Sequence, residues 1–178
     1  MKITKTKFKG LLLVSGVRFF DSRGYFREII KNKNFSKKNF IFWCMSKSKK
    51  NVLRGLHLQK TDQQEKFISV VKGKILDVAV DLRKNSKTFG KHFKTILSEK
   101  NSRSVFIPKG FAHGFLCLDY ENIIVYGNSK YRSKNNEIGL IWNDKNLNIK
   151  WPKKKLIISS KDKKNISLKE FIKKKIIL

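Results

Sequence analysis

The sequence predicts an all-β fold of the sandwich or barrel type, with a jelly roll as the favoured architecture. Short runs of β-branched and aromatic residues recur along most of the 178 residues and are separated by turn-forming residues, whereas long apolar repeats of helical period are nearly absent. Many short strands at regular spacing are typical of two packed sheets or a closed barrel. The interior of such a barrel is a natural ligand site.

Ten segments are predicted as strands joined by short connections. Their bounds are 11–18, 24–30, 40–45, 52–59, 67–71, 75–82, 93–97, 104–107, 114–118 and 123–126. The Lys72-Gly73 pair predicts a hairpin turn between the fifth and sixth of them. No internal repeat or long linker is visible, so residues 1–178 are predicted to form one domain.

One helix is predicted, near the C-terminus. Ser167 and Glu170 have the spacing of a capping box, which indicates a helix start. The apolar residues expected on its packing face are Leu168, Phe171, Ile172 and Ile176.

The strong positive charge limits the classes of partner. Lys and Arg number 42 against 13 Asp and Glu, which is compatible with nucleic acid, an anionic membrane or a polyanionic small molecule as partner. Proteins that read nucleic acid concentrate arginine and exposed aromatic residues in one patch. Here only seven of the 42 are arginine and the lysines are scattered. A solvated lysine surface is therefore favoured, with neither nucleic acid nor membrane as partner.

The cysteines and the N-terminus indicate a cytoplasmic protein. Cys44 and Cys117 lack the spacing of metal ligands and lie in apolar strands, which predicts buried free thiols in a reducing compartment. The apolar piece 11–14 is too short for a signal core or a membrane span.

The segment 52–59 is the centre of the predicted site. It places Arg54, His57 and Gln59 among leucines. Because residues two apart share a strand face, His57 and Gln59 are expected to point together into the interior. A lone histidine in an apolar run is more often a core residue bonded to a carbonyl, so the rest of the chain must support a functional role.

A second motif spans 108–115, with proline before a turn, Gly110 at its bend and His113 entering the next strand. This Pro-x-Gly-x-x-His pattern resembles the second sequence motif of cupin barrels. In metal-binding cupins, the first motif adds His-x-His and a glutamate around one ion. This chain has Gln59 in place of the second histidine, and His92 lies in a lysine-rich turn. Neither a metal nor another cofactor is expected.

The polar residues expected inside the barrel suit acid–base catalysis next to a carbonyl. They are His57, His113, Lys66, Tyr126 and a carboxylate. Such catalysis needs a base for the carbon-bound proton, a cation or imidazole at the enolate oxygen, and an acid that returns a proton. If base and acid lie on opposite faces of the substrate, the stereocentre inverts.

Several short motifs follow one another in register from about Arg18 to Asp162, with Lys66 and Tyr126 between them. They are Arg-Gly-Tyr-Phe-x-Glu at 23–28, Leu-Arg-Gly-Leu-His-x-Gln at 53–59, Asp-Val-Ala-Val-Asp-Leu-Arg at 77–83, Ile-Pro-x-Gly-Phe-Ala-His-Gly-Phe at 107–115, Ile-Trp-Asn-Asp at 141–144, Ile-x-Trp-Pro at 149–152 and Ser-Ser-Lys-Asp at 159–162. Together they resemble the dTDP-4-dehydrorhamnose 3,5-epimerase family. The resemblance implies a cupin jelly-roll barrel with a short C-terminal helix, and a cofactor-free isomerase that acts on a nucleotide-diphosphate 4-keto sugar.

The resemblance also implies a role for each matched residue. His57 is implied as the base at C3 and C5 of the sugar, with Asp162 orienting its imidazole. Tyr126 is implied as the proton donor on the far face, and Lys66 as the cation beside the C4 oxygen. The implied substrate contacts are Arg23, Arg54 and Lys161 at the diphosphate, and Glu28, Gln59, His113 and Glu137 elsewhere. For Glu137, an ordinary surface carboxylate remains nearly as well supported.

The chain departs from the family pattern at 42–44. Where the family has Gln-x-Asn in contact with substrate, this chain has Phe42-Trp43-Cys44. Replacing two amides removes hydrogen-bonding groups, and a buried polar partner left without them costs about 1–3 kcal/mol. The departure predicts an altered nucleotide or sugar, such as a GDP-linked 4-keto-heptose.

Two other functions stay open. A 3,4-ketoisomerase shares the barrel and the enolisation but moves the carbonyl. A non-catalytic cupin that binds sugar nucleotides or nucleic acid would leave the acid–base residues without a purpose. The resemblance further implies a homodimer paired through strands exchanged near the N-terminus, which would cover a sheet edge, and a role in deoxysugar or heptose synthesis for a surface polysaccharide.

Overall fold

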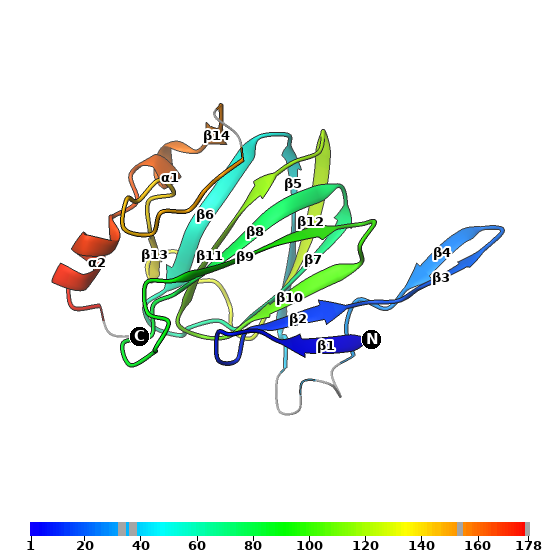
Figure 1. Ribbon diagram of the computed structural model, residues 1–178, viewed down its shortest axis with the longest axis horizontal. Coiled ribbons are helices and arrows are strands. Elements are labelled where there is room, and N and C mark those ends of the chain that lie inside the picture. Colours follow the sequence, from blue (N-terminus) through cyan, green and yellow to red (C-terminus); the bar gives the residue numbers. More distant parts are fainter. Residues whose placement is uncertain (32–34, 36–38, 153–154, 177–178) are drawn as a thin grey trace.

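Two β-sheets make up most of the computed structural model, which describes residues 1–31, 35, 39–152 and 155–176 (Figure 1). The first sheet has the order β1-β2-β10-β7-β12-β5. Its strands are β1 (Lys2–Lys5), β2 (Leu12–Ser15), β10 (Arg103–Ile107), β7 (Lys66–Lys72), β12 (Glu121–Asn128) and β5 (Phe42–Lys49). The second sheet has the order β13-β6-β11-β8-β9, with β14 paired to β6. Its strands are β13 (Glu137–Gly139), β6 (Val52–Gln59), β11 (Phe111–Cys117), β8 (Lys74–Asp81), β9 (His92–Ser98) and β14 (Ile157–Ile158). The all-β prediction is confirmed.

The two sheets bury apolar side chains between them. Ile68 on β7 and Ile124 on β12 belong to the same buried cluster as Ala79 on β8 and Phe115 on β11. Burial of this apolar surface holds the sheets face to face.

A second cluster covers the outer face of the second sheet. Leu56 and Leu58 of β6 pack there with residues of the C-terminal segment, including Phe171. Because neighbouring side chains on a strand point to opposite faces, His57 between these leucines is directed to the inner face. The leucine spacing of the 52–59 motif thus sets the direction of the histidine.

The predicted hairpin at Lys72-Gly73 is wrong. Strand β7 pairs with β10 and β12 in the first sheet, whereas β8 pairs with β9 and β11 in the second. The turn therefore carries the chain from one sheet to the other. Gly73 has a φ of 82°, and a Cβ atom there would lie 2.2 Å from the carbonyl oxygen of Glu121, so only glycine fits this bend.

A two-stranded hairpin extends from the barrel, formed by β3 (Arg18–Asp21) and β4 (Gly24–Arg27) (Figure 1). The predicted strand 11–18 is consequently divided, because β2 ends at Ser15 and β3 begins at Arg18. The hairpin exposes large aromatic side chains, among them Phe20, which is 68% exposed.

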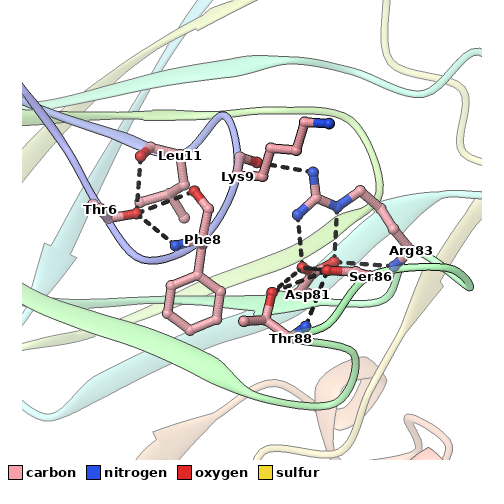
Figure 2. Close-up of polar contacts among 8 residues, drawn as sticks. All are labelled: Thr6, Phe8, Lys9, Leu11, Asp81, Arg83, Ser86 and Thr88. Carbon is pink, nitrogen blue, oxygen red and sulfur yellow. Dashed lines mark hydrogen bonds and ion pairs between the residues drawn. The ribbon is translucent and has the colours of Figure 1, made fainter.

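A polar cluster at the end of β8 ties the N-terminal turn to the second sheet, as Figure 2 shows. The buried carboxylate of Asp81 accepts hydrogen bonds from Arg83 (2.7 Å), Ser86 (2.6 Å) and Thr88 (2.6 Å). The Arg83 guanidinium also donates to the carbonyl oxygen of Lys9 at 2.9 Å. The end of the 77–83 motif is therefore structural.

The C-terminal helix α2 (Leu168–Lys173) starts at the predicted capping box, because both hydrogen bonds between Ser167 and Glu170 are present. Leu168 and Phe171 are buried as predicted, and Ile176 packs against the core beyond the end of the helix. Ile172, predicted on the packing face, is 53% exposed, so this part of the prediction is wrong. A one-turn helix, α1 (Ser160–Lys163), was not predicted.

Both cysteines are free, as predicted, and Cys117 is buried. Cys44 is exposed, which contradicts the prediction of two buried thiols, because β5 forms the edge of its sheet and turns Cys44 toward an open cavity. In the part of the chain that the structure describes, no helix has the length and apolar character that a membrane crossing requires.

Candidate active site

A cavity of about 710 Å³ opens between the two sheets. Strands β5, β7 and β12 of the first sheet and β6, β11 and β13 of the second contribute side chains to it, together with the segment 157–162. The predicted catalytic residues His57, Tyr126, Lys66 and Asp162 all lie among its lining residues.

His57 is hydrogen bonded to Asp162, with 2.6 Å between imidazole Nε2 and carboxylate Oδ1. The side chain of Ser159 caps α1 by accepting a hydrogen bond from the backbone N–H of Asp162, which fixes the carboxylate beside β6. Burial raises the pKa of Asp162, but hydrogen bonds with His57, the Gly55 N–H and Ser159 lower it by a larger amount. The pKa of Asp162 therefore lies below its usual value. Asp162 is therefore an anion that orients the imidazole.

The close approach of β6 and β11 depends on two glycines. A Cβ atom at Gly55, whose φ is 117°, would lie 2.5 Å from Cα of Gly114. The register between the strands shifts next to this contact, between His113 and Phe115, and His113 is paired with His57. The glycines thus let both histidines of the two sequence motifs lie side by side on neighbouring strands.

Tyr126 enters the cavity from β12, on the sheet opposite to that of His57. Its phenol oxygen lies 2.7 Å from the hydroxyl oxygen of Ser46 on β5. Burial raises the pKa of Tyr126 well above its usual range, so the phenol stays protonated at neutral pH. The cavity therefore has an imidazole on one wall and a phenolic acid on the other.

Lys66 begins β7 on the same wall as Tyr126. Burial lowers the pKa of its ammonium, and the nearby Glu137 opposes this effect by raising it. A partly buried cation next to the reacting groups is suited to stabilise negative charge on a substrate oxygen.

His113 forms a second imidazole–carboxylate pair, with 2.7 Å between its Nε2 and Oδ2 of Asp77. Both side chains are buried, at 5% and 0% exposure, whereas His57 is 27% exposed. His57 is therefore the more accessible of the two imidazoles.

Glu137 on β13 forms ion pairs with two cationic side chains at the cavity wall. Its carboxylate accepts two hydrogen bonds from Arg132, at 2.8 and 3.2 Å, and a further contact from Lys161. Burial raises the pKa of Glu137, but Arg132 and Lys161 lower it to about 2. Arg54 adds a further cation to the lining and donates to Ser48 at 3.0 Å.

Similarity to known proteins shows the family to which the chain belongs. The family model for dTDP-4-dehydrorhamnose 3,5-epimerase matches residues 5–170. The chain belongs to this family. A dTDP-4-dehydrorhamnose 3,5-epimerase from Shigella flexneri is 42% identical over 168 residues, which cover 91% of this chain and 93% of that protein.

Solved structures agree with this membership. The epimerase from Legionella pneumophila in complex with dTDP-4-keto-L-rhamnose has a TM-score of 0.94 and 35% identity, over 99% of this chain and 96% of that one. The Bacillus anthracis epimerase with TDP and PPi bound has a TM-score of 0.90 and 39% identity, over 94% of this chain and 99% of that one. These neighbours confirm the cupin jelly-roll barrel, and family membership confirms an isomerase of the nucleotide-sugar epimerase type.

Six of the seven predicted substrate-binding residues fall into two groups. Arg54, His113, Glu137 and Lys161 line the cavity. Arg23 and Glu28 do not: Arg23 lies on the tip of the projecting hairpin, is 88% exposed and pairs with Asp21, while Glu28 follows β4 and pairs with Lys31.

Gln59 was expected to point into the interior with His57, and the structure places it behind the cavity wall. Its amide oxygen accepts a hydrogen bond from the N–H of Ser133 at 2.5 Å, and its amide nitrogen donates to the carbonyl oxygens of Asp62 (2.9 Å) and Tyr131 (3.4 Å). Gln59 is thus fully occupied with the backbone of neighbouring loops, one of which follows β12.

The sequence analysis singled out neither Ser46 nor Arg132, which both line the cavity. Ser46 lies two positions beyond Cys44 on β5, so strand alternation could have placed it on the same face. Arg132 lies in a polar loop that has no periodicity to indicate its direction. Among the residues that the structure describes, no group of three or more His, Cys, Asp or Glu side chains is arranged to hold a metal ion.

Proposed function

We propose that this protein is a nucleotide-diphosphate 4-keto-sugar 3,5-epimerase that inverts C3, C5 or both. The observation that supports it is the entry of His57 and Tyr126 into one cavity from opposite sheets, with Lys66 beside them. A sugar ring held between these two side chains has a base on one face and an acid on the other.

The first step removes the proton from the carbon next to the C4 ketone. Asp162 is ionised and bonded to Nε2 of His57, so Nε2 carries the hydrogen and Nδ1 has the free lone pair. Nδ1 takes the carbon-bound proton, the C–H electron pair forms the carbon–carbon double bond of the enolate, and the C4 oxygen becomes negative. The Lys66 ammonium stabilises that oxygen.

The second step returns a proton on the opposite face. Tyr126 gives its phenolic proton to the enolate carbon, the double-bond electrons form the new C–H bond, and the ketone is restored with the centre inverted. The resulting phenolate is next to Ser46, whose hydroxyl donates a hydrogen bond to it. Exchange of protons with water resets His57 and Tyr126.

The cations of the cavity hold the diphosphate. Arg54 and Lys161 line the cavity. The two phosphates of the substrate together carry about two negative charges, which these cations neutralise. His113 and Glu137 are proposed as contacts to other parts of the substrate.

The protein is proposed to act as a homodimer in which the β3–β4 hairpin of each chain reaches the cavity of the other. This arrangement explains why Arg23 and Glu28 do not line their own cavity. It also covers the exposed aromatic side chains of the hairpin, such as Phe20 and Phe26, which would otherwise be in contact with water.

Two features favour different nucleotides. The relatives are named for dTDP-linked substrates, which favours a dTDP-4-keto-6-deoxyhexose. Phe42 and Cys44, which stand where the family has two amides, both line the cavity, which favours a remodelled substrate such as a GDP-4-keto-heptose. Either activity would serve deoxysugar or heptose synthesis for a surface polysaccharide, in the cytoplasm where two free thiols persist.

A panel of dTDP- and GDP-linked 4-keto sugars in deuterated water tests the function. We expect deuterium at C3, C5 or both, detected by mass spectrometry, and inverted product by NMR. A product whose carbonyl has moved to C3 would identify a 3,4-ketoisomerase instead. Absence of exchange with every substrate of the panel would contradict an enolising enzyme.

A further inference from the structure

Two cations converge on one oxygen atom at the cavity wall. Nη2 of Arg132 lies 3.2 Å from Oε1 of Glu137, and Nζ of Lys161 contacts the same Oε1. Nε of Arg132 bonds the other carboxylate oxygen at 2.8 Å. The two donor groups therefore lie close enough together for one ligand to contact both.

The charges in this cluster do not balance. Arg132 and Lys161 bring two positive charges against the single negative charge of Glu137. The side chains of the two cations are 49% and 55% exposed, whereas that of Glu137 is 8% exposed. All three line the cavity. An excess positive charge on accessible donors is suited to bind an anion.

We propose that Arg132 binds the diphosphate of the nucleotide sugar together with Lys161, and that Glu137 holds the two cations in position for it. This inference rests on the proposed function and adds a ligand-binding residue to it. Arginine is suited to this role because its fork of N–H donors matches two oxygens at once, so it can bond the carboxylate and a phosphate from different edges.

The backbone around Arg132 is held in place from behind the cavity wall. Gln59, which is only 4% exposed, bonds the carbonyl of Tyr131 on one side of Arg132 and the N–H of Ser133 on the other. Gln64 donates to the carbonyl of Lys130 at 2.9 Å in the same loop. A guanidinium on a fixed loop loses less conformational freedom on binding than one on a free surface loop. Gln59 is thus a positioning residue for Arg132.

Calorimetric titration with dTDP, GDP and inorganic pyrophosphate tests the inference without any need for turnover. For Arg132→Gln we expect Kd for the nucleoside diphosphates and for pyrophosphate to rise roughly 10- to 100-fold, because a charge-assisted hydrogen bond is lost. Lys134→Gln is the matched control, since it removes one positive charge from an exposed residue of the same loop outside the cavity lining. Its Kd should stay within about twofold of the wild type, because an exposed charge outside the cavity is screened by water and salt.

A structural role alone would give a different result. If Arg132 only fastens its loop to Glu137, Arg132→Gln lowers the melting temperature but leaves Kd equal to that of Lys134→Gln, and the inference is overturned. The dependence of Kd on salt gives a second readout, because loss of a diphosphate-binding cation weakens this dependence and loss of a structural pair does not. Arg132→Lys keeps the charge without the fork, so its Kd should lie between those of the wild type and Arg132→Gln. If Arg132→Gln does not fold, the Kd of Arg132→Lys tests the inference in its place.

The result separates this inference from the proposed function. If the wild type binds dTDP or GDP and exchanges deuterium while Arg132→Gln binds equally well, only the role of Arg132 fails. If the wild type binds none of the three probes, the proposed function fails and this inference fails with it.

Discussion

The imidazole of His57 and the carboxylate of Asp162 lie 105 residues apart in the chain and 2.6 Å apart in the structure. Asp162 reaches His57 because Ser159 caps the short helix α1 next to β6. We expect Asp162→Asn to lower kcat roughly 10²- to 10⁴-fold, since the neutral amide neither fixes the basic tautomer nor stabilises the imidazolium. KM should change much less. Deuterium exchange into the substrate measures the loss, and Asp119→Asn, outside the cavity lining, is the charge-matched control.

Replacement of Tyr126 separates proton removal from inversion. In Tyr126→Phe the base is intact, so we expect the substrate to keep exchanging deuterium with retention, while inversion slows at least about 100-fold. NMR of the product distinguishes exchange with retention from inversion. His57→Asn should abolish exchange itself. Equal loss of exchange and inversion in Tyr126→Phe would show that the phenol acts before the enolate forms.

The central part of the site could be predicted from the sequence because strand periodicity and tertiary packing agree there. Strand β6 has the predicted bounds, and Leu56 and Leu58 on one face direct His57 to the other. The same periodicity failed at Lys72-Gly73, where two alternating runs on either side of a glycine turn give the same pattern whether they pair with each other or belong to facing sheets.

Other parts of the site depend on contacts that no local pattern contains. Strand alternation places Gln59 on the same face as His57, yet its side-chain amide is hydrogen bonded to the backbone of neighbouring loops. Arg132 lies in an irregular loop, and its direction is set by Glu137 on β13, a three-residue strand too short to predict. The position of Arg23 on a projecting hairpin could not be inferred from a motif that places it with cavity residues.

The alkaline limit of activity should depend on Lys66. Burial lowers the pKa of this ammonium, so its charge is lost as pH rises, at a pH below the usual lysine value of about 10.4. Tyr126 does not set this limit, because burial raises its pKa. We expect kcat/KM of the wild type to fall with rising pH through the lowered pKa of Lys66. Lys66→Arg should be slower but lose this fall, because guanidinium stays protonated. An unchanged alkaline limb in Lys66→Arg would assign the fall to another group.

Glu137 should make folding stability depend on acid pH. Its pKa in the folded protein is about 2, despite the opposing effect of burial, because Arg132 and Lys161 stabilise the carboxylate. A folded pKa below the unfolded value means that the stabilisation is present above about pH 4.5 and is lost as pH falls toward 2. Its size is at most about 3 kcal/mol, and less after screening of the half-exposed cations. Urea unfolding at pH 7 and pH 3 should show the stability difference between wild type and Glu137→Gln shrinking at pH 3. If the stability difference between wild type and Glu137→Gln were the same at both pH values, Glu137 would not be the source of the pH dependence.

The proposed exchange of hairpins makes a quantitative prediction for mixed dimers. If Arg23 of one chain completes the cavity of the other, Arg23→Gln and His57→Asn impair different parts of each composite site. Co-expression in equal amounts gives about half mixed dimers, each with one intact site, so activity should return to about a quarter of the wild-type value. Co-expression of His57→Asn with Tyr126→Phe is the matched control, because both residues belong to the same barrel and no intact site can form. If each hairpin instead stays with its own barrel, co-expression of Arg23→Gln with His57→Asn should give an activity no higher than the mean of the activities of the two single variants.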